Sequence, residues 1–418
     1  MYITRTVEHA IQRTAESFPC IAVYGARQVG KSTTVNHIFG KKYQMVTLDD
    51  VNDRALASEN PRLFLETYGT PLIIDEIQKV PSLLDEIKKV IDQKRMEWVE
   101  NDRPHELLYV LTGSNRYELQ QGISDSLAGR CGELEMSSFS NPEKNGFEAS
   151  LFDPSISALL ARSRQQDIAY RTRAQVFEGI FQGGMPDIVL GNSERDIYFQ
   201  SYINTYLEKD IRQIIQSSSE VAFRNFLSII ALRTSQELHY DVVAQAVGID
   251  VRTCKKWISI LETSGIICLL QPYMANMSNR IIKSPKLYFL DTGLCSYLCR
   301  WPDSTMLENG AMGGAFFETY IVSEFFKNLS AFGVDPKDHL YYYRDKDQKE
   351  IDLLFVQSDT IYPIEIKKST SPKDPLKNFS VLDKYHLNIG NGLVIDSCDK
   401  IRPITENAFY YPVYRIGE

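Results

Sequence analysis

A glycine-rich loop near the start of the chain most constrains how this sequence folds. It comprises Gly25, Ala26, Arg27, Gln28, Val29, Gly30, Lys31, Ser32 and Thr33. Its first part matches the pattern G-x-x-x-x-G-K-[ST], and it stands between an apolar run, Ile21-Ala22-Val23-Tyr24, and a helical pattern. In that context the backbone N–H groups of the loop and the N-terminus of the helix bind phosphate. The sequence therefore predicts a strand–loop–helix unit that binds ATP.

The residue types around the loop indicate hydrolysis as well as binding. Lys31 is expected to pair with the β- and γ-phosphates, and Ser32 to hold Mg. Asp75 ends another apolar run, at the sheet edge where ligands of parallel sheets bind, so we expect it to be the second anchor of the Mg. Glu76 beside it can polarise the attacking water. Arg27 either contacts phosphate or covers the loop with its aliphatic stem.

Two further residues are predicted to act on the γ-phosphate. Ser114 follows the apolar run 107–111, where its hydroxyl can contact the γ-phosphate or the attacking water. Arg130 ends the run Ser126-Leu127-Ala128-Gly129-Arg130 and can reach nucleotide in its own subunit or in a neighbour. The second arrangement requires a homo-oligomer or an ATP-dependent assembly.

Other distinctive runs are spread over most of the chain. They are Leu48-Asp49-Asp50, Ile74-Asp75-Glu76-Ile77-Gln78-Lys79-Val80-Pro81, Leu127-Ala128-Gly129-Arg130, Gly183-Gly184-Met185-Pro186, Tyr206-Leu207-Glu208-Lys209-Asp210-Ile211 and Phe289-Leu290-Asp291-Thr292-Gly293-Leu294. With the loop, these runs resemble a widespread family of bacterial and archaeal AAA-type ATPases fused to a C-terminal domain of unknown function. The resemblance implies an ATPase core, a helical connection, a winged helix and a PD-(D/E)XK nuclease-like region, without a settled biological role.

A second set of charged residues lies in the C-terminal third. Asp352 and the pair Glu365 and Lys367 lie on neighbouring apolar runs, and Glu318 lies on a helical segment upstream. This order is consistent with the D…(D/E)-x-K core of the restriction-endonuclease-like fold, whose paired strands bring such carboxylates together. Carboxylate oxygens suit Mg or Mn, so Glu318, Asp352 and Glu365 are predicted metal ligands. Lys367 can orient or activate the attacking water, which makes all four predicted catalytic residues.

The same pattern also has a simpler explanation. Charged residues that alternate along a strand usually form its solvated face, and Glu365 and Lys367 flank Ile366 in this way. A fold of this kind can also be retained as a binding module after its activity is lost. An active nuclease and a silent module therefore both stay open.

Residues 234–273 look like a helix-turn-helix followed by a wing. A helix begins at Tyr240, Gly248 makes the turn, and a second helix runs from Val251 to Thr263. Such a second helix can contact DNA. It carries Arg252, Lys255 and Lys256. Winged helices also join proteins, and the net charge of -8 does not favour tight DNA binding.

The expected fold class is therefore α/β, with several domains. We expect an AAA-type P-loop NTPase core with a parallel sheet in 1–140, a helical connecting region in 141–232, a winged helix in 233–275 and a restriction-endonuclease-like α/β domain in 276–418. No apolar run approaches the length of a bilayer span, and the seven cysteines are scattered. We therefore expect a cytoplasmic protein with reduced thiols and no membrane partner.

Together these expectations describe an ATP-hydrolysing, DNA-processing enzyme. ATP and Mg are its predicted cofactors, DNA is its predicted partner, and a Mg- or Mn-dependent deoxyribonuclease is its predicted second activity. The alternative is a nucleotide-dependent switch or scaffold whose C-terminal module binds protein or nucleic acid without cleavage. A transcriptional regulator is less favoured, because the chain lacks an evident dimerising heptad.

Overall fold

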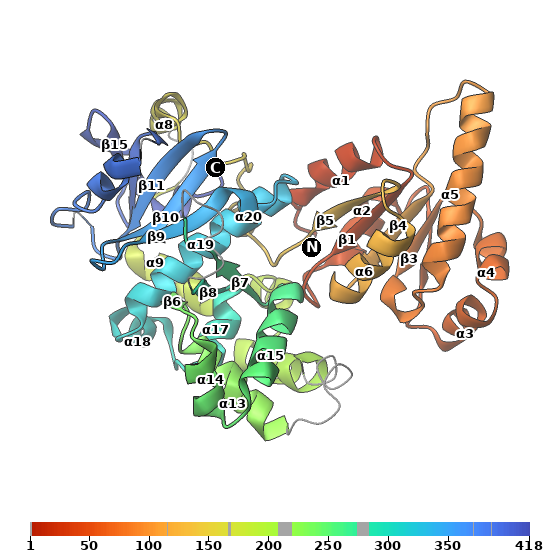
Figure 1. Cartoon of the computed structure of the whole chain (residues 1–418), viewed down its shortest axis with the longest axis horizontal. Helices are drawn as coiled ribbons and strands as arrows, with labels where there is room; N and C mark the ends of the chain where they lie inside the picture. Colours follow the sequence, from red (N-terminus) through yellow and green to blue (C-terminus); the bar gives the residue numbers. More distant parts are fainter. Residues whose placement is uncertain are drawn as a thin grey trace.

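The computed structural model describes residues 2–114, 116–165, 169–207, 220–273, 284–370, 372–385 and 387–418. Residues 208–211, in one of the runs that carry the family resemblance, lie outside the described residues. Two parts built around β-sheets lie at opposite ends of the molecule, with helices between them (Figure 1). None of the described helices combines the length and the apolar character that crossing a bilayer requires.

The N-terminal part is built on a parallel sheet. Its strands are β1 (Cys20–Tyr24), β2 (Gln44–Thr47), β3 (Leu72–Asp75), β4 (Tyr109–Gly113) and β5 (Cys131–Glu135), in the order β2-β3-β4-β1-β5. The helices are α1 (Val7–Ala15), α2 (Lys31–Phe39), α3 (Val51–Glu59), α4 (Pro61–Tyr68), η1 (Ile77–Lys79), α5 (Leu83–Glu100) and α6 (Arg116–Ser126). The central strands β1 and β4 are buried along their whole length, as continuous apolar runs predict. The predicted α/β fold with a parallel sheet is confirmed.

A helical region follows this sheet. It comprises α7 (Asn141–Asn145), α8 (Ile156–Ser163), α9 (Arg173–Gln182), α10 (Pro186–Val189), α11 (Arg195–Tyr202), η2 (Ile203–Leu207) and α13 (Glu220–Ala231). Its aromatic side chains are largely internal, because Phe177, Phe199 and Phe226 are fully buried. The aromatic pattern of this stretch therefore forms core rather than surface.

Two helices and a small antiparallel sheet come next. They are α14 (Tyr240–Val247), α15 (Val251–Thr263), β6 (Gln236–Glu237), β7 (Ile267–Leu270) and β8 (Lys286–Phe289), with the strands in the order β6-β8-β7. The left-handed conformation of Gly248 ends α14, and both helices begin where the sequence predicts. β8 lies beyond the expected domain boundary at residue 275, yet it pairs with β6 and β7.

The C-terminal part is a mixed sheet packed against helices. The helices are α17 (Thr292–Leu298), α18 (Ser304–Asn309), α19 (Gly313–Ala331), α20 (Pro336–His339), η3 (Phe379–Tyr385) and η4 (Val413–Arg415). The strands are β9 (Leu340–Arg344), β10 (Glu350–Gln357), β11 (Thr360–Ile366), β12 (Asn388–Ile389), β13 (Gly392–Asp396), β14 (Arg402–Thr405) and β15 (Ala408–Pro412). Their order is β14-β15-β13-β11-β10-β9, with β12 beside β11. The predicted strands at β9, β10 and β11 are present, and both of their pairings are antiparallel.

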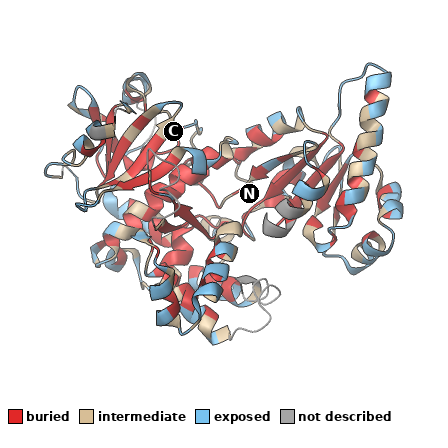
Figure 2. Ribbon diagram, viewed as in Figure 1, coloured by how far each residue is buried: buried red, intermediate tan, exposed pale blue. Residues whose placement is uncertain are grey.

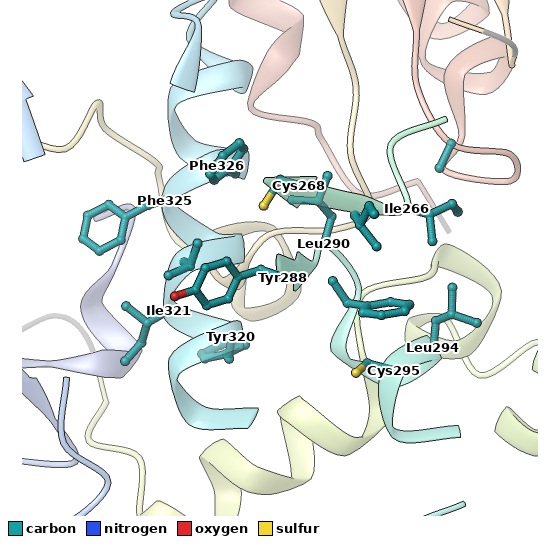
Figure 3. Close-up of a cluster of buried hydrophobic side chains, with 14 of the residues drawn as sticks. Ile266, Cys268, Tyr288, Leu290, Leu294, Cys295, Tyr320, Ile321, Phe325 and Phe326 are labelled. Carbon is teal, nitrogen blue, oxygen red and sulfur yellow. The ribbon is translucent and has the colours of Figure 1, made fainter. Parts of the chain in front are cut away.

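One continuous apolar core joins the two sheets. It runs from Ile21 and Val110 on one face of the N-terminal sheet to Leu353 and Tyr411 on the C-terminal sheet. The helix α19 lies in its middle and packs against α1, β5, β8 and β11 (Figure 2). Figure 3 shows Tyr288 of β8 packed against this helix among buried side chains. Because the burial of this apolar surface stabilises both parts at once, we expect them to fold as a unit.

A hydrogen-bonded junction at Asp291 ties the helical region to α17. One carboxylate oxygen of Asp291 accepts from the Gly184 N–H at 2.9 Å, and the other accepts from the Leu294 N–H at 3.0 Å. Gly183 has a φ of +81°, and a Cβ there would lie 2.4 Å from Asp291 Oδ1. Only glycine allows this close approach. Two of the runs singled out in the sequence thus meet at one point.

Replacing Asp291 with alanine should destabilise the protein strongly. The change removes the cap of α17 and leaves the buried Gly184 N–H unpaired, which together cost about 2–4 kcal/mol. Asp303→Ala is the matched control, because Asp303 caps α18 at an exposed position and its loss should cost about 1 kcal/mol. Urea denaturation would measure both. Equal losses in the two variants would contradict a special role for the Asp291 junction.

Candidate functional site

The predicted loop connects β1 to α2. Gly30 is in the left-handed conformation at the start of α2, and a Cβ on Gly25 would lie 2.0 Å from the Met136 carbonyl oxygen. Lys31 is buried, and its Nζ donates to the carbonyl oxygens of Gly25 and Ala26 at 3.0 and 2.8 Å. The ammonium therefore lies over the loop, where it can meet phosphate oxygens.

Asp75 collects three hydroxyl groups at the carboxyl end of β3. Ser32 Oγ donates to its Oδ1 at 2.7 Å, Thr47 Oγ1 donates to its Oδ2 at 3.4 Å, and Thr112 Oγ1 also donates to Oδ1. A hydroxyl and a carboxylate side by side are the oxygen ligands that Mg²⁺ accepts in P-loop proteins. Ser32 and Asp75 are therefore the residues that would hold a nucleotide-bound Mg²⁺.

Glu76 and Ser114 are also brought together. Ser114 Oγ donates to Glu76 Oε2 at 3.0 Å, and the Gln78 amide donates to the same carboxylate oxygen. Glu76 has a φ of +57°, a sparsely populated conformation that aims its side chain toward Ser114. Gln78 was not predicted as a site residue, although it lies in one of the distinctive runs. Its Oε1 is buried and has no hydrogen-bond partner among the described residues.

A pocket of about 570 Å³ lies over the phosphate-binding loop, and its lining includes neither Ser114 nor Gln78. Arg27, Gln28, Val29, Gly30, Lys31, Ser32 and Thr33 lie along it, with Asp75 and Glu76. The remaining lining comes from segments that the sequence analysis did not connect to the site. They include Tyr2, Ile3, Arg5, Asp49, Phe139, Pro186, Asp187, Leu190 and Asn192. The run Gly183-Gly184-Met185-Pro186 was the sequence signal for the part of the lining between Pro186 and Asn192, because this run leads directly into α10.

Arg5 fixes the loop to the segment after β5. Its guanidinium donates to the Val29 carbonyl at 2.7 Å and to the Ser137 carbonyl at 2.6 Å, and its Nε lies 3.1 Å from Glu143 Oε1. The side chain is 4% exposed, so these charge-assisted bonds are shielded from water. Arg5 is therefore a structural support of the nucleotide pocket that no sequence motif indicated.

Arg130 is not near the pocket of its own subunit. It precedes the first residue of β5, whereas the loop follows the last residue of β1, and the two strands are parallel. The two positions are thus separated by roughly 16 Å, the length of a five-residue strand. Arg130 instead binds Asp92 of α5 through two hydrogen bonds of 2.6 and 3.0 Å. Arg130 is therefore not brought to the nucleotide loop of its own chain.

Asp352, Glu365 and Lys367 come together on two central strands of the C-terminal sheet, where β10 begins and β11 ends. They lie on the paired strands β10 and β11 and just after β11. Lys367 Nζ is 2.6 Å from Glu365 Oε1 and 3.8 Å from Asp352 Oδ2. Asp352 Oδ2 also accepts the Ile366 N–H at 2.8 Å. The alternation of Glu365 and Lys367 is therefore not a solvated face, because Glu365 is 5% exposed.

This cluster has an excess of negative charge. Burial, and then the carboxylates of Glu318 and Glu365, raise the pKa of Asp352 to about 8. Burial likewise raises the pKa of Glu365, whose Oε2 is buried and makes no hydrogen bond with the described residues. An unpartnered buried carboxylate oxygen fits a cation. Asp352 and Glu365 are the residues that would hold it.

Glu318 lies on α19, and its carboxylate already accepts hydrogen bonds from two side chains. Its Oε1 accepts from Lys286 Nζ at 3.1 Å and from the Tyr288 hydroxyl at 2.6 Å. Neither donor was predicted, because β8 is distant from β10 and β11 in the sequence. Within the part of the chain that the structure describes, no three His, Cys, Asp or Glu side chains are placed as a ready metal cage. The predicted ligand set of Glu318, Asp352 and Glu365 is thus not preassembled.

The basic residues of α15 lie on its outer face. Arg252, Lys255 and Lys256 are exposed, and Lys255 Nζ lies 5.5 Å from the centre of the Tyr240 ring. The opposite face of α15 is buried through Cys254, Trp257, Ile258 and Leu261. This helix therefore presents positive charge to solvent while it is anchored in the core.

Comparison with known proteins divides the chain into three matched segments. Residues 17–144 match a family described as an AAA domain, residues 173–305 match a domain of unknown function (DUF8612), and residues 313–416 match another (DUF4143). The curated relatives include the uncharacterized proteins Rv2008c of Mycobacterium tuberculosis and Mb2031c of Mycobacterium bovis. Each is 25% identical over 87% of this chain and 73% of its own length.

A solved structure with partial similarity is the Walker-type ATPase PABY2304 of Pyrococcus abyssi. It is 14% identical, with a TM-score of 0.42 over 70% of this chain and 94% of its own. The AAA-domain match coincides with the parallel sheet, the phosphate-binding loop and the Ser32–Asp75 pair. Residues 17–144 are therefore an AAA-type P-loop ATPase domain that binds ATP.

Proposed function

We propose that this protein is an ATP-driven DNA-processing enzyme, in which nucleotide turnover controls a metal-dependent, phosphodiester-cleaving C-terminal domain. The observation that carries the proposal is the cluster of Asp352, Glu365 and Lys367 on paired strands. The buried Glu365 Oε2 has no hydrogen-bond partner among the described residues, and the pKa of Asp352 is raised, so the cluster lacks positive charge. In a purely structural ion-pair network the positive and negative charges would be equal in number, whereas a site that accepts a cation and a phosphate can carry an excess of negative charge.

The residues of the cluster divide the cleavage chemistry between them. A bound Mg²⁺ or Mn²⁺ would activate water and stabilise charge on the phosphate. Asp352 is oriented by the Ile366 N–H, and Glu365 by Lys367, so both carboxylates are held before an ion arrives. Despite burial, Asp352 and Glu365 raise the pKa of Lys367, so its ammonium stays charged and can orient water or a phosphate oxygen.

In the ATPase domain, the proposed roles follow the hydrogen bonds. Lys31, now bonded to the loop carbonyls, would bind the phosphates, and Ser32 and Asp75 would hold Mg²⁺. Glu76 polarises the attacking water, with its carboxylate positioned by Ser114. Arg130 acts on the nucleotide of a neighbouring subunit, which makes the active form a homo-oligomer.

A continuous route connects the two sites. The segment 186–192 forms one wall of the nucleotide pocket, and Gly184 just before it is bonded to Asp291. Asp291 follows β8, whose residues Lys286 and Tyr288 bind Glu318 beside the C-terminal cluster. A shift of this wall on nucleotide binding would therefore act on β8 and reach the carboxylates.

DNA is the proposed substrate because a basic helix lies beside this route. The arrangement of α14, α15, β7 and β8 is consistent with a winged helix, and the exposed Arg252, Lys255 and Lys256 suit phosphate contacts. The overall charge of -8 limits such contacts to this local surface.

The second candidate is a nucleotide-dependent switch or scaffold that binds protein or nucleic acid without cutting. One observation favours it: the Lys367 ammonium already lies between Asp352 and Glu365, where a metal would bind. In that case Lys367 would occupy the position of the metal permanently. Both candidates share the ATPase domain, so they differ in whether the C-terminal site takes a metal.

Lys31→Ala should abolish ATP hydrolysis, and wild-type hydrolysis should respond to DNA. If DNA is the effector, one of single-stranded, duplex or branched DNA should raise the steady-state rate at least about tenfold, equivalent to about 1.4 kcal/mol of barrier. Lys42→Ala, at an exposed position just beyond α2, is the control and should hydrolyse normally. A wild-type rate that is indifferent to every DNA would favour the switch.

Asp352→Asn should lower metal-dependent DNA cleavage by roughly 100-fold or more, because it removes a charge that holds the ion. Cleavage of the DNA form that stimulates hydrolysis would be followed with Mg²⁺ or Mn²⁺. Asp359→Asn, exposed on the turn between β10 and β11, is the matched control. Equal and negligible cleavage by both variants and the wild type would end the nuclease proposal.

Arg130→Ala and Lys31→Ala should complement each other if Arg130 acts between subunits. Each variant alone should be inactive, yet a mixture contains interfaces that pair an intact Lys31 with an intact Arg130. Arg103→Ala, exposed at the end of α5, should stay active by itself. ATP turnover of the mixture would be measured, and recovered activity is expected if Arg130 acts in trans. A mixture as inactive as its components would exclude an action in trans.

A further inference from the structure

Lys286 is a buried cation that the proposed cleavage chemistry does not use. It is 3% exposed, its Nζ lies 3.1 Å from Glu318 Oε1, and it also donates to Glu350 Oε1. Glu350 is two residues before Asp352 on β10, and Lys286 interacts with both carboxylates. The carboxylate cluster therefore contains a lysine on the α19 side in addition to Lys367.

Tyr288 is the second hydrogen-bond donor to Glu318. It lies two residues after Lys286 on β8, and its hydroxyl donates to the same Glu318 oxygen at 2.6 Å. The tyrosine is fully buried against α19 (Figure 3), so its hydroxyl has little freedom to turn elsewhere. Burial alone would lower the pKa of Lys286, but Glu318, Glu350 and Asp352 raise it, so the lysine keeps its charge. Glu318 Oε1 is thereby committed to two donors from one strand.

The charges around the site limit how many ions it can take. Glu318, Glu350, Asp352 and Glu365 face Lys286, Lys367 and the Arg344 guanidinium, which lies 3.6 Å from Glu350 Oε2 and 3.0 Å from a fifth carboxylate, that of Glu237. With all five carboxylates ionised, two negative charges remain. One divalent ion would balance them, whereas a second ion would leave an excess of positive charge in a buried site even with a phosphodiester bound.

We infer that Lys286 is a built-in cation of this site and that, with Tyr288, it makes Glu318 a positioning residue rather than a metal ligand. The site then takes one Mg²⁺ or Mn²⁺, held by Asp352 and by Glu365, whose buried Oε2 has no partner among the described residues. This inference rests on the proposed function and differs from the expectation that Glu318 binds metal. It assigns Lys286 the place that a second ion would otherwise occupy.

Counting bound Mn²⁺ tests the inference. Mn²⁺ would be titrated into the full chain and followed by the electron paramagnetic resonance signal of the free ion, in a Ser32→Ala background that removes the ion of the nucleotide loop. One ion per chain is expected, lost in Asp352→Asn and in Glu365→Gln and retained in Glu318→Gln. Lys286→Met should take a second ion, because Glu318 and Glu350 are released, and a merely structural lysine would not produce that gain.

Three further variants serve as an alternative, a rescue and a control for this titration. Lys286→Gln keeps an N–H donor for Glu318 without the charge and serves if Lys286→Met does not fold, with the same second ion expected. Lys286→Arg should restore a single ion. Lys349→Met, exposed between β9 and β10, is the matched control and should bind one. Two ions in the parent chain, none at all, or only one in the folded Lys286→Gln variant would overturn the inference.

The count also separates this inference from the proposed function. One bound ion in a protein that cuts no DNA would end the proposed cleavage and leave the role of Lys286 intact. DNA cleavage by a protein that binds two ions would support the proposed function and contradict the inference on Lys286.

Discussion

The apolar core around α19 is the constraint on which the rest of the structure depends. Most residues of this helix are buried, and it contacts elements of the N-terminal sheet, the small antiparallel sheet and the C-terminal sheet. Its few buried charges are paired, because Glu324 accepts the Asn141 N–H at 2.6 Å and lies 3.1 Å from Lys327 Nζ. Since a buried charge without a partner is costly, these pairs allow the charges to lie in the core, and the Asn141 bond ties α19 to α7. Glu318 takes its place in the C-terminal site from this packing.

Local sequence was sufficient to predict the features that depend on local structure. The loop from Gly25 to Ser32, the helix from Val251 and the pairing of β10 with β11 each follow from residue order and periodicity, because each element contains its own signals. The association of Asp352 with Glu365 followed from the same pairing. These are contacts that strand geometry enforces over a short stretch of chain.

The contacts that could not be predicted are those between distant segments. Lys286 and Tyr288 reach Glu318 only because β8 pairs with β6 and β7 and packs on α19. Asp187 lines the nucleotide pocket just after Gly184, which is bonded to Phe139 and to Asp291, more than a hundred residues further along. The position of Arg130 depends on the direction of β5 in the sheet, which the sequence pattern around Arg130 does not encode. Tertiary packing, rather than local propensity, determines each of these.

The bonds of Arg5 to Val29 and Ser137 have a consequence for the kinetics and affinity of nucleotide binding. A glycine-rich loop that is free in solution must lose conformational entropy when it closes around phosphate, and this loss weakens binding. Here a buried guanidinium holds the loop carbonyl, and the carboxylate of Glu143 holds the guanidinium in turn. The ordering of the loop is thus part of the folding free energy of the domain and not of the binding step. Conditions that loosen the fold near Arg5 should consequently weaken ATP affinity before they unfold the protein.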